Sequence, residues 1–489
     1  MNDPKLIVLE SWLIEATVDE IQAKLTSGDL TSSELVRMYL HRIAKIDQSG
    51  PKLNSILEVN PEALHIARRL DQERELKGVR GPLHGIPVVI KDNIDTHDKM
   101  HTSAGSLALK ESIAPKDAHI VKQLREAGAI ILGKTNLTEW ANFMTVGMKN
   151  GYSSRGGQVL NPYGPGTFDV GGSSAGTGAA IAANLATIGI GTETSGSILS
   201  PSSQNSLVGI KPTVGLVSRT GIIPISHSQD TAGPMARTVK DAALLLNVLS
   251  SADEKDPITL SCVDHDIDYT DCINGGWVRL NEINIGIQDK IIEYLDEEKQ
   301  TIIKNAIESL KETGVQIKHD VKVPSMGEKW DINVMLYEFK TNLNAYLSNL
   351  DSQVEVRTLK DVIDFNWMHE DRTLKYGQSL LIDSEKTSGR LTDSEYLNSL
   401  EQDIYFSKAA GIDQLFKDEN LDIIVSPNNY GAMLPAKAGY PSITVPCGYT
   451  KAGEPVGITF TGSAYSEPLL IYVAYTFEQA TKCRRAPQF

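Results

Sequence analysis

Apolar residues form two kinds of run along this chain. Short continuous runs are typical of strands buried on both faces. They occur at Val88–Ile90, Ala129–Leu132, Asp422–Val425 and Ser442–Val445. Between them lie helical patterns, for example Asp117–Ala127, which Gly128 ends, and the closing pattern Glu467–Thr481. Strands that are apolar on both faces need helices on both sides, so the pattern predicts an α/β fold with a sheet covered by helices on both faces.

The first 75 residues are predicted to be helical. Thr17–Glu20 and Thr31–Glu34 both have the form of a capping box, which marks a helix start. We expect residues 1–75 to form an N-terminal helical region that packs on a core spanning 76–489. Within that core, residues 325–405 are predicted to form a mainly helical insertion.

Charge and cysteine content restrict the function. The formal net charge of −15 disfavours a nucleic-acid partner, because such binding depends on clustered Lys and Arg. The N-terminus lacks the cleavage site of a secretory signal, and the longest apolar run, Ala179–Gly191, is too short to span a membrane. We therefore expect a cytoplasmic protein, and that location disfavours a Cys262–Cys272 bridge.

Two motifs suggest a phosphate site and a metal site, but the sequence around each motif disfavours that site. Gly128–Thr135 matches the phosphate-loop pattern G-x-x-x-x-G-K-[ST], but its interior positions are the apolar strand itself and leave no loop to surround a phosphate. His97 and His101 have the spacing of helical metal ligands, yet they lie in a polar segment without helix signals or an evident third ligand. We expect neither an ATP site nor a metal site.

The segment from Val170 to Thr213 contains the strongest candidate chemistry. Two clusters rich in Gly and hydroxyl groups, Gly171–Gly176 and Thr192–Ser197, flank an Ala-rich helix. Such clusters allow close backbone packing, which is one interpretation. The other is that they bring hydroxyls and free backbone N–H groups to one point, where these could stabilise an oxyanion. Composition alone does not decide between the two.

The same segment resembles the amidase signature family, and the resemblance extends over several further blocks. These are Gly81–Asn93, Gly133–Asn136 with Glu139, Gly209–Arg219, Ser228–Pro234, Ala236–Asp241, Ala438–Pro446 and Glu454–Gly457. The resemblance implies a single domain with a mixed central sheet, and an amidase that cleaves a carboxamide to carboxylate and ammonia. It implies no cofactor and no metal, and it makes the insertion at 325–405 the substrate side.

Carried over residue by residue, the family's catalytic lysine is Lys91, its bridging serine is Ser173 on a cis peptide bond, and its nucleophile is Ser197. Burial after Val88–Ile90 would keep Lys91 neutral, so that it could act as a base through Ser173. The backbone N–H groups of Thr194, Ser195, Gly196 and Ser197 would bind the oxyanion.

Three positions depart from the family pattern. Glu193 replaces an Asp, Ser195 replaces a Gly, and Leu199 replaces a basic residue. The loss of the basic residue would remove an ion pair beside the nucleophile loop.

Among family members, the chain is most similar to peptide amidases, which release ammonia from C-terminal peptide amides. Trp140, Phe143 and Tyr337 would then form an apolar substrate pocket. One alternative is the glutaminase-type subunit of a tRNA-dependent amidotransferase. An alternative of another class is a catalytically silent binding protein on the same fold. The sequence leaves the oligomeric state open.

Overall fold

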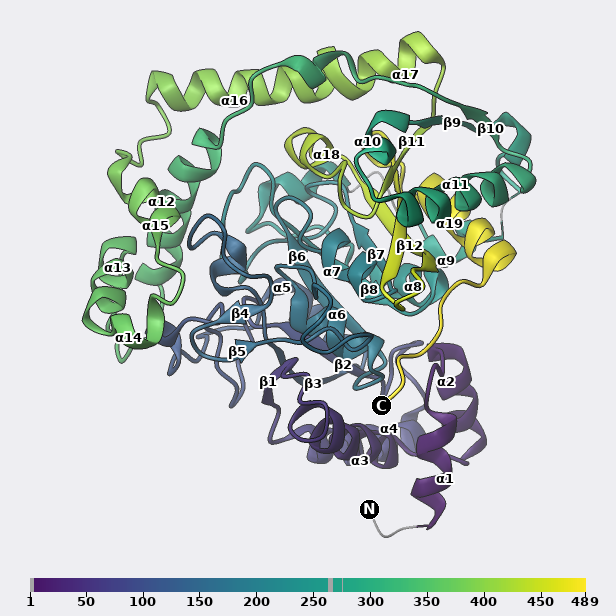
Figure 1. Cartoon of the computed structure of the whole chain (residues 1–489). Helices are drawn as coiled ribbons and strands as arrows, with labels where there is room; N and C mark the ends of the chain where they lie inside the picture. The colour runs from purple at the N-terminus through teal and green to yellow at the C-terminus, as the bar shows by residue number, and fades with distance from the viewer. Residues whose placement is uncertain (1–3, 263–266, 275) are drawn as a thin grey trace.

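The computed structural model describes residues 4–262, 267–274 and 276–489. Within these ranges a mixed sheet of 11 strands runs through the molecule in the order β1-β3-β2-β6-β8-β7-β12-β13-β11-β9-β10 (Figure 1). The strands are β1 (Ile56–Val59), β2 (Pro87–Lys91), β3 (Ile130–Thr135), β6 (Ile188–Glu193), β7 (Val208–Lys211), β8 (Thr231–Ala236), β9 (Asn284–Ile287), β10 (Gln316–Lys318), β11 (Ile423–Pro427), β12 (Ser442–Tyr449) and β13 (Pro455–Thr461). The strands β4 (Tyr152–Ser153) and β5 (Gly157–Gln158) pair separately.

Helices cover both faces of this sheet, as the apolar strands predicted. One face carries α6 (Ala175–Ala182) and α7 (Leu199–Gln204), which contact each other and the strands below them. The other face carries a row of helices: α5 (His119–Glu126), α8 (Val239–Leu249), α19 (Glu467–Thr481) and α11 (Glu297–Glu312). The short helices α9 (Tyr269–Cys272), α10 (Asp289–Glu293), α17 (Asp413–Glu419) and α18 (Met433–Ala438) complete the cover.

The N-terminal region packs against the core and also enters the sheet. Its helices are α1 (Pro4–Trp12), α2 (Val18–Ser27), α3 (Ser32–Arg42) and α4 (Ala63–Lys77). Both predicted capping boxes are present, at Thr17 and Thr31. Arg42 donates to the carbonyls of Ala183 and Asn184 at the end of α6. The prediction of helices alone missed β1, which pairs antiparallel with β3 at the sheet edge.

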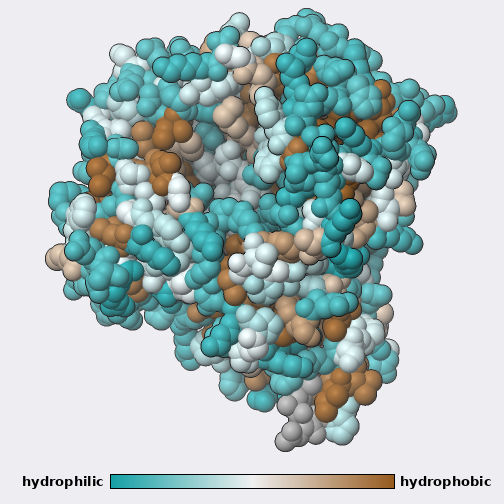
Figure 2. All heavy atoms as spheres, viewed as in Figure 1, coloured by the Kyte–Doolittle hydropathy of each residue, from teal (hydrophilic) through white to brown (hydrophobic). Residues whose placement is uncertain are grey.

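The predicted insertion is mainly helical. It contains α12 (Asn333–Ser348), α13 (Leu359–Met368), α14 (Glu370–Thr373), α15 (Ser379–Lys386) and α16 (Ser394–Ser407). Figure 1 shows α12–α15 at one side of the molecule and α16 across its top, and Figure 2 shows the surface hollowed between them and the core. Tyr346 of α12 donates its hydroxyl to Asp95 of the core over 2.7 Å, which ties the insertion to the loop after β2.

None of the helices in the described ranges combines the length and apolar character that a membrane span requires. Cys272 is a free thiol, whereas the side chain of Cys262 lies outside the described part of the chain.

Close packing of α6 on the sheet depends on Gly176. A Cβ atom at this position would lie 2.3 Å from the carbonyl oxygen of Asn136 and 2.5 Å from that of Ser55, and both are backbone atoms. We therefore expect Gly176→Ala to lower the free energy of unfolding by about 1–3 kcal/mol, measured by urea denaturation. Gly81→Ala is the matched control, because among the described residues no atom beyond Gly81 and its two chain neighbours lies within 4 Å of the added methyl group. Equal stability of the two variants would contradict this prediction.

Candidate active site

Lys91 ends strand β2, the third strand from one edge of the sheet, inside the protein. All five residues of β2 are buried between the parallel strands β3 and β6, and Lys91 itself is 0% exposed. The continuous apolar run Val88–Ile90 therefore carries the amine into a region that water does not reach. The burial predicted from the sequence is confirmed.

The amine of Lys91 contacts hydroxyls and a carbonyl. Its Nζ lies 2.7 Å from Ser173 Oγ, 2.8 Å from Thr192 Oγ1 and 3.2 Å from the carbonyl oxygen of Thr192. Among the described residues, no carboxylate lies within 4 Å of Nζ to form an ion pair. Burial lowers the pKa of Lys91 to about 7, against the opposing effect of the negative charges of Asp230 and Glu193. A large part of the Lys91 population is thus neutral near pH 7.

Ser173 is held on a loop that approaches other backbone segments closely. The peptide bond between Gly172 and Ser173 is cis, as the family resemblance implies. The carbonyl of Ser173 accepts a hydrogen bond from the backbone N–H of Thr138 over 3.0 Å. A Cβ atom at Gly172 would lie 2.6 Å from Thr138 Oγ1, so the glycine permits this approach.

Ser197 lies on the loop between β6 and α7, which we call the nucleophile loop (residues 194–198). It is 8% exposed, and its carbonyl accepts a hydrogen bond from the backbone N–H of Ser174 over 3.2 Å. This bond joins the nucleophile loop to the loop that carries Ser173. The two predicted serine loops therefore meet, and Lys91 reaches the first of them directly.

Glu193 determines which amides of the nucleophile loop are available. Its carboxylate accepts hydrogen bonds from the backbone N–H groups of Gly196, Ile198 and Leu199 at 2.6, 2.7 and 3.0 Å. The amide of Gly196, a predicted oxyanion donor, is therefore already engaged. Among the described residues, the amides of Thr194, Ser195 and Ser197 have no such acceptor.

A buried cation acts on Glu193 although Leu199 replaces the family's basic residue. Leu199 is buried, and the positive charge of Lys211 on β7 favours the ionised form of the Glu193 carboxyl. Burial nevertheless raises the pKa of Glu193 above its usual range. Lys211 itself donates to the carbonyl of Tyr440 over 2.6 Å.

A cavity of about 470 Å³ lies beside these groups. Its walls combine Asn93, which lies after β2, with residues of β6, the segment 219–231 and α12. The lining residues are Asn93, Ala141, Thr192, Thr194, Arg219, Thr220, Ile222, Ile223, Pro224, Ile225, His227, Asp230, Thr231, Lys255, Asp256, Asn342, Ala345, Tyr346 and Asn349.

The three predicted pocket residues lie elsewhere. Trp140 and Phe143 are buried in an apolar cluster with residues of α12, where Phe143 contacts Phe339 with ring centroids 5.0 Å apart. Tyr337 packs against Tyr396. Of the segment proposed from the sequence, only the neighbouring Ala141 reaches the cavity wall. Trp140 and Phe143 thus pack against Phe339, Leu343 and Leu347 of α12, whereas Tyr337 packs on α16.

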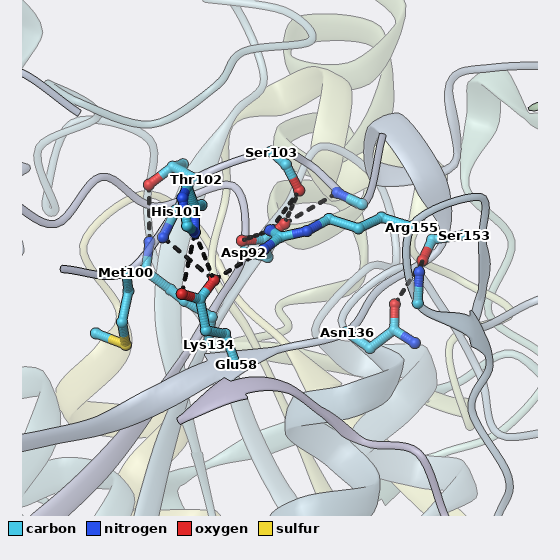
Figure 3. A network of polar contacts seen from close by, with 12 residues as sticks. Glu58, Asp92, Met100, His101, Thr102, Ser103, Lys134, Asn136, Ser153 and Arg155 are labelled. Atoms are coloured by element: carbon cyan, nitrogen blue, oxygen red, sulfur yellow. Dashed lines mark hydrogen bonds and ion pairs between the residues drawn. The ribbon is translucent and has the colours of Figure 1, made fainter. Parts of the chain in front are cut away.

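A second polar network surrounds Asp92, the residue directly after Lys91 (Figure 3). Asp92 accepts hydrogen bonds from the hydroxyl of Ser103 and the backbone N–H of Gly105. Arg155 donates to Ser103 over 3.0 Å and to Glu58 of β1 over 2.8 Å. These bonds fix the chain directly after Lys91. Arg155 and Glu58 were not predicted from the sequence, since neither belongs to a motif that signals an ion pair.

The phosphate-loop pattern and the histidine pair, whose ligands the sequence disfavoured, form hydrogen bonds with other parts of the protein. Lys134 of the phosphate-loop pattern lies at the end of strand β3, where its amine donates to Thr102 Oγ1 over 2.8 Å. His97 contacts the carbonyl of Ala114, and His101 contacts Glu58. Among the described residues, no group of three or more His, Cys, Asp or Glu side chains could hold a metal ion.

The fold and the matching blocks define the class of protein. The chain belongs to the amidase family, whose family model matches residues 34–471. It is therefore a hydrolase that acts on amide C–N bonds.

Individual relatives agree with this class. A probable amidase of Arabidopsis thaliana is 39% identical and covers 97% of this chain and 92% of its own length. The crystal structure of an amidase family protein from Bacillus anthracis superimposes with a TM-score of 0.94 at 41% identity, covering 100% of this chain and 95% of that one. The peptide amidase of Stenotrophomonas maltophilia gives 0.90 at 42% identity, covering 97% and 99%. A glutamyl-tRNA(Gln) amidotransferase subunit of Alkalilimnicola ehrlichii is 32% identical over 97% of this chain and 99% of its own.

The hydrogen bonds of Glu193 give a testable consequence for stability. Replacing Glu193 with Gln puts an amide NH₂ group where one carboxylate oxygen now accepts hydrogen bonds from backbone N–H groups. We expect a loss of about 1–3 kcal/mol in the free energy of unfolding, measured by urea denaturation. Glu193→Asp keeps both acceptor oxygens and should lose less. A Gln variant as stable as the Asp variant would show that the three bonds contribute little.

Proposed function

We propose that this amidase cleaves a carboxamide to carboxylate and ammonia through an acyl-enzyme on Ser197, with Ser173 and Lys91 as its proton relay. One observation carries the proposal. A fully buried amine with a pKa of about 7 lies 2.7 Å from a hydroxyl whose loop is bonded to that of a second serine. A lysine is normally charged at pH 7, because its unperturbed pKa is about 10.4, and a charged amine cannot accept a proton. Desolvation lowers the pKa, so that the neutral form becomes available.

The hydrogen bonds of Lys91 suit a base. A neutral amine has two N–H groups and one lone pair. The two N–H groups can donate to the carbonyl and the hydroxyl of Thr192, which leaves the lone pair to accept the proton of Ser173. The Thr192 hydroxyl is itself fixed, since it also accepts a bond from Asn93 Nδ2 over 3.0 Å.

The reaction then runs in two halves. Ser197 Oγ forms a bond to the amide carbonyl carbon while its proton passes to Ser173 and the proton of Ser173 passes to Lys91. The amides of Thr194, Ser195 and Ser197 are the available donors for the oxyanion. The C–N bond breaks as the proton returns through Ser173 to the leaving amine. Water hydrolyses the acyl-enzyme by the same relay and releases the carboxylate.

The substrate we propose is a C-terminal peptide amide with an apolar last residue. The run Ile222–Ile225 and Ala345 give the cavity a largely apolar wall, and about 470 Å³ is enough for a large side chain. The high similarity to a peptide amidase over nearly the whole chain supports this choice.

The 32% identical amidotransferase protein supports a rival function, in which ammonia from glutamine passes to a partner subunit. Ammonia release by the purified chain from peptide amides, free amino-acid amides and glutamine distinguishes the two. Preference for glutamine, together with dependence on a partner, would favour the rival. A silent binding protein, the third alternative, would neither release ammonia nor react at Ser197 with a fluorophosphonate.

Removal of the nucleophile or the base should abolish activity without unfolding the protein. We expect Ser197→Ala and Lys91→Met to lower kcat by about 10³-fold or more for a peptide amide. Met is chosen because it fills the same buried volume without a charge. Ammonia release measures activity, circular dichroism measures folding, and a fluorophosphonate probe measures the reactivity of Ser197.

A second buried lysine provides the matched control. Lys134 is the last but one residue of the neighbouring strand β3 and is also 0% exposed, but its amine bonds to Ile94 and Thr102, away from both serines. Lys134→Met should keep kcat within about 10-fold of the wild type. Near wild-type activity of folded Lys91→Met would reject Lys91 as the base.

The pH dependence follows from the lowered pKa of Lys91. Below that pKa the amine is protonated and accepts no proton from Ser173, whereas above it the amine is neutral and active. We expect kcat/KM for an uncharged amide to rise with increasing pH in a step centred near pH 7. A rate that is flat, or that falls, from about pH 6 to pH 8 would contradict a neutral Lys91 base.

A further inference from the structure

Asp230 lies between the cavity and the nucleophile loop, immediately before β8. It lines the cavity, and both of its carboxylate oxygens accept hydrogen bonds from the protein. Oδ1 accepts the hydroxyl of Thr194, the first residue of the nucleophile loop. Oδ2 accepts the backbone N–H groups of Ile225 and Ser226 at 2.8 and 2.9 Å. One carboxylate thus joins the cavity wall to the loop that carries Ser197.

The same connection is reinforced by the residue beside Asp230. Gln229 Nε2 donates to the carbonyl of Thr194 over 3.4 Å, so Thr194 is held through both its side chain and its backbone. The amide of Thr194 is one of the donors available to an oxyanion, and its orientation depends on this support. A displacement of about 1 Å at such a donor costs about 100-fold in rate.

Charge adds a second effect on the same site. Asp230 and Glu193 are the carboxylates whose negative charges favour protonated Lys91, and the positive charge of Arg219 favours ionised Asp230. Burial raises the pKa of Asp230 to about 6, so its carboxyl is mostly ionised at pH 7. Its negative charge therefore keeps the pKa of Lys91 higher than burial alone would leave it.

We propose that Asp230 is a positioning residue of the hydrolysis: its carboxylate fixes Thr194, and with it the oxyanion-binding amides, against the wall of the substrate cavity. This role rests on the function proposed above. A substrate that contacts Ile225 from the cavity and displaces it would shift the nucleophile loop, because Asp230 is hydrogen-bonded to both Ile225 and Thr194.

The same segment offers a matched control in Glu338 of α12. This fully buried carboxylate accepts the hydroxyls of Ser226 and Ser228 from the segment that Asp230 holds, and also that of Tyr396 over 2.8 Å. It contacts no residue of the nucleophile loop and is absent from the charges that act on Lys91. Glu338→Gln therefore loosens the segment without removing the proposed function of Asp230.

Three variants separate the hydrogen bond from the charge. We expect Asp230→Asn to lower kcat for a peptide amide by about 10–100-fold with a smaller change in KM. Without the negative charge, Lys91 loses its proton more easily, so the midpoint of the pH–rate profile moves down by up to about one pH unit. Thr194→Val removes the hydroxyl and keeps the charge, so kcat falls while the midpoint stays. Glu338→Gln should leave the midpoint at its wild-type pH.

These outcomes decide the proposal. Wild-type kcat and midpoint in folded Asp230→Asn would overturn it, as would an equal midpoint shift in Glu338→Gln, which would indicate a general loosening of the segment. If Asp230→Asn does not fold, Thr194→Val with wild-type kcat would overturn it instead. Activity retained by Lys91→Met would reject the proposed function itself, independently of these results.

Discussion

The burial of one amine is the constraint on which the site depends. Lys91 ends a buried strand whose neighbours on both sides are parallel, and no carboxylate among the described residues pairs with it. The protein carries the cost of desolvating this amine, and that cost is what lowers its pKa to about 7. A carboxylate close enough to stabilise the positive charge would raise this pKa and keep the amine protonated at pH 7, so that it could not accept the proton that the proposed chemistry gives it.

The loops around Lys91 follow from the same constraint. A hydroxyl reaches a fully buried amine only if its backbone comes very close, and the chain achieves this with glycines next to Ser173. The carboxylates of the site accept hydrogen bonds from backbone N–H groups and form no ion pair with the amine. Glu193 binds three amides at the start of α7, and Asp230 binds two more together with a hydroxyl. Their charges act on Lys91 from a distance, which leaves its pKa low but not extreme.

Much of the fold and of the candidate site was predictable from the sequence, because these parts depend on local sequence patterns. Apolar runs indicated β2, β3, β11 and β12, and the family blocks placed Lys91, Ser173 and Ser197. The strand β1 was missed because its four residues carry a charge and sit at an edge. Two features depend on three-dimensional detail that no pattern records: the use of the Gly196 amide by Glu193, and the turning of Trp140 and Phe143 away from the cavity.

The division of the cavity between core and insertion explains how one family can host different substrates. Asn93 after β2 and Thr192 of β6 line the wall beside the bonds of Lys91, whereas α12 supplies Asn342, Ala345 and Tyr346, and Asn349 follows directly after α12. Substitutions on α12 can reshape that wall without touching the proposed relay, because Lys91 bonds to Ser173 and Thr192 and to no residue of α12. Substitutions in the segment 222–230 would differ in this respect. The segment lines part of the cavity, and it is hydrogen-bonded both to Glu338 of α12 and, through Asp230, to the nucleophile loop. It is therefore the element through which a change in substrate fit would reach the reacting groups.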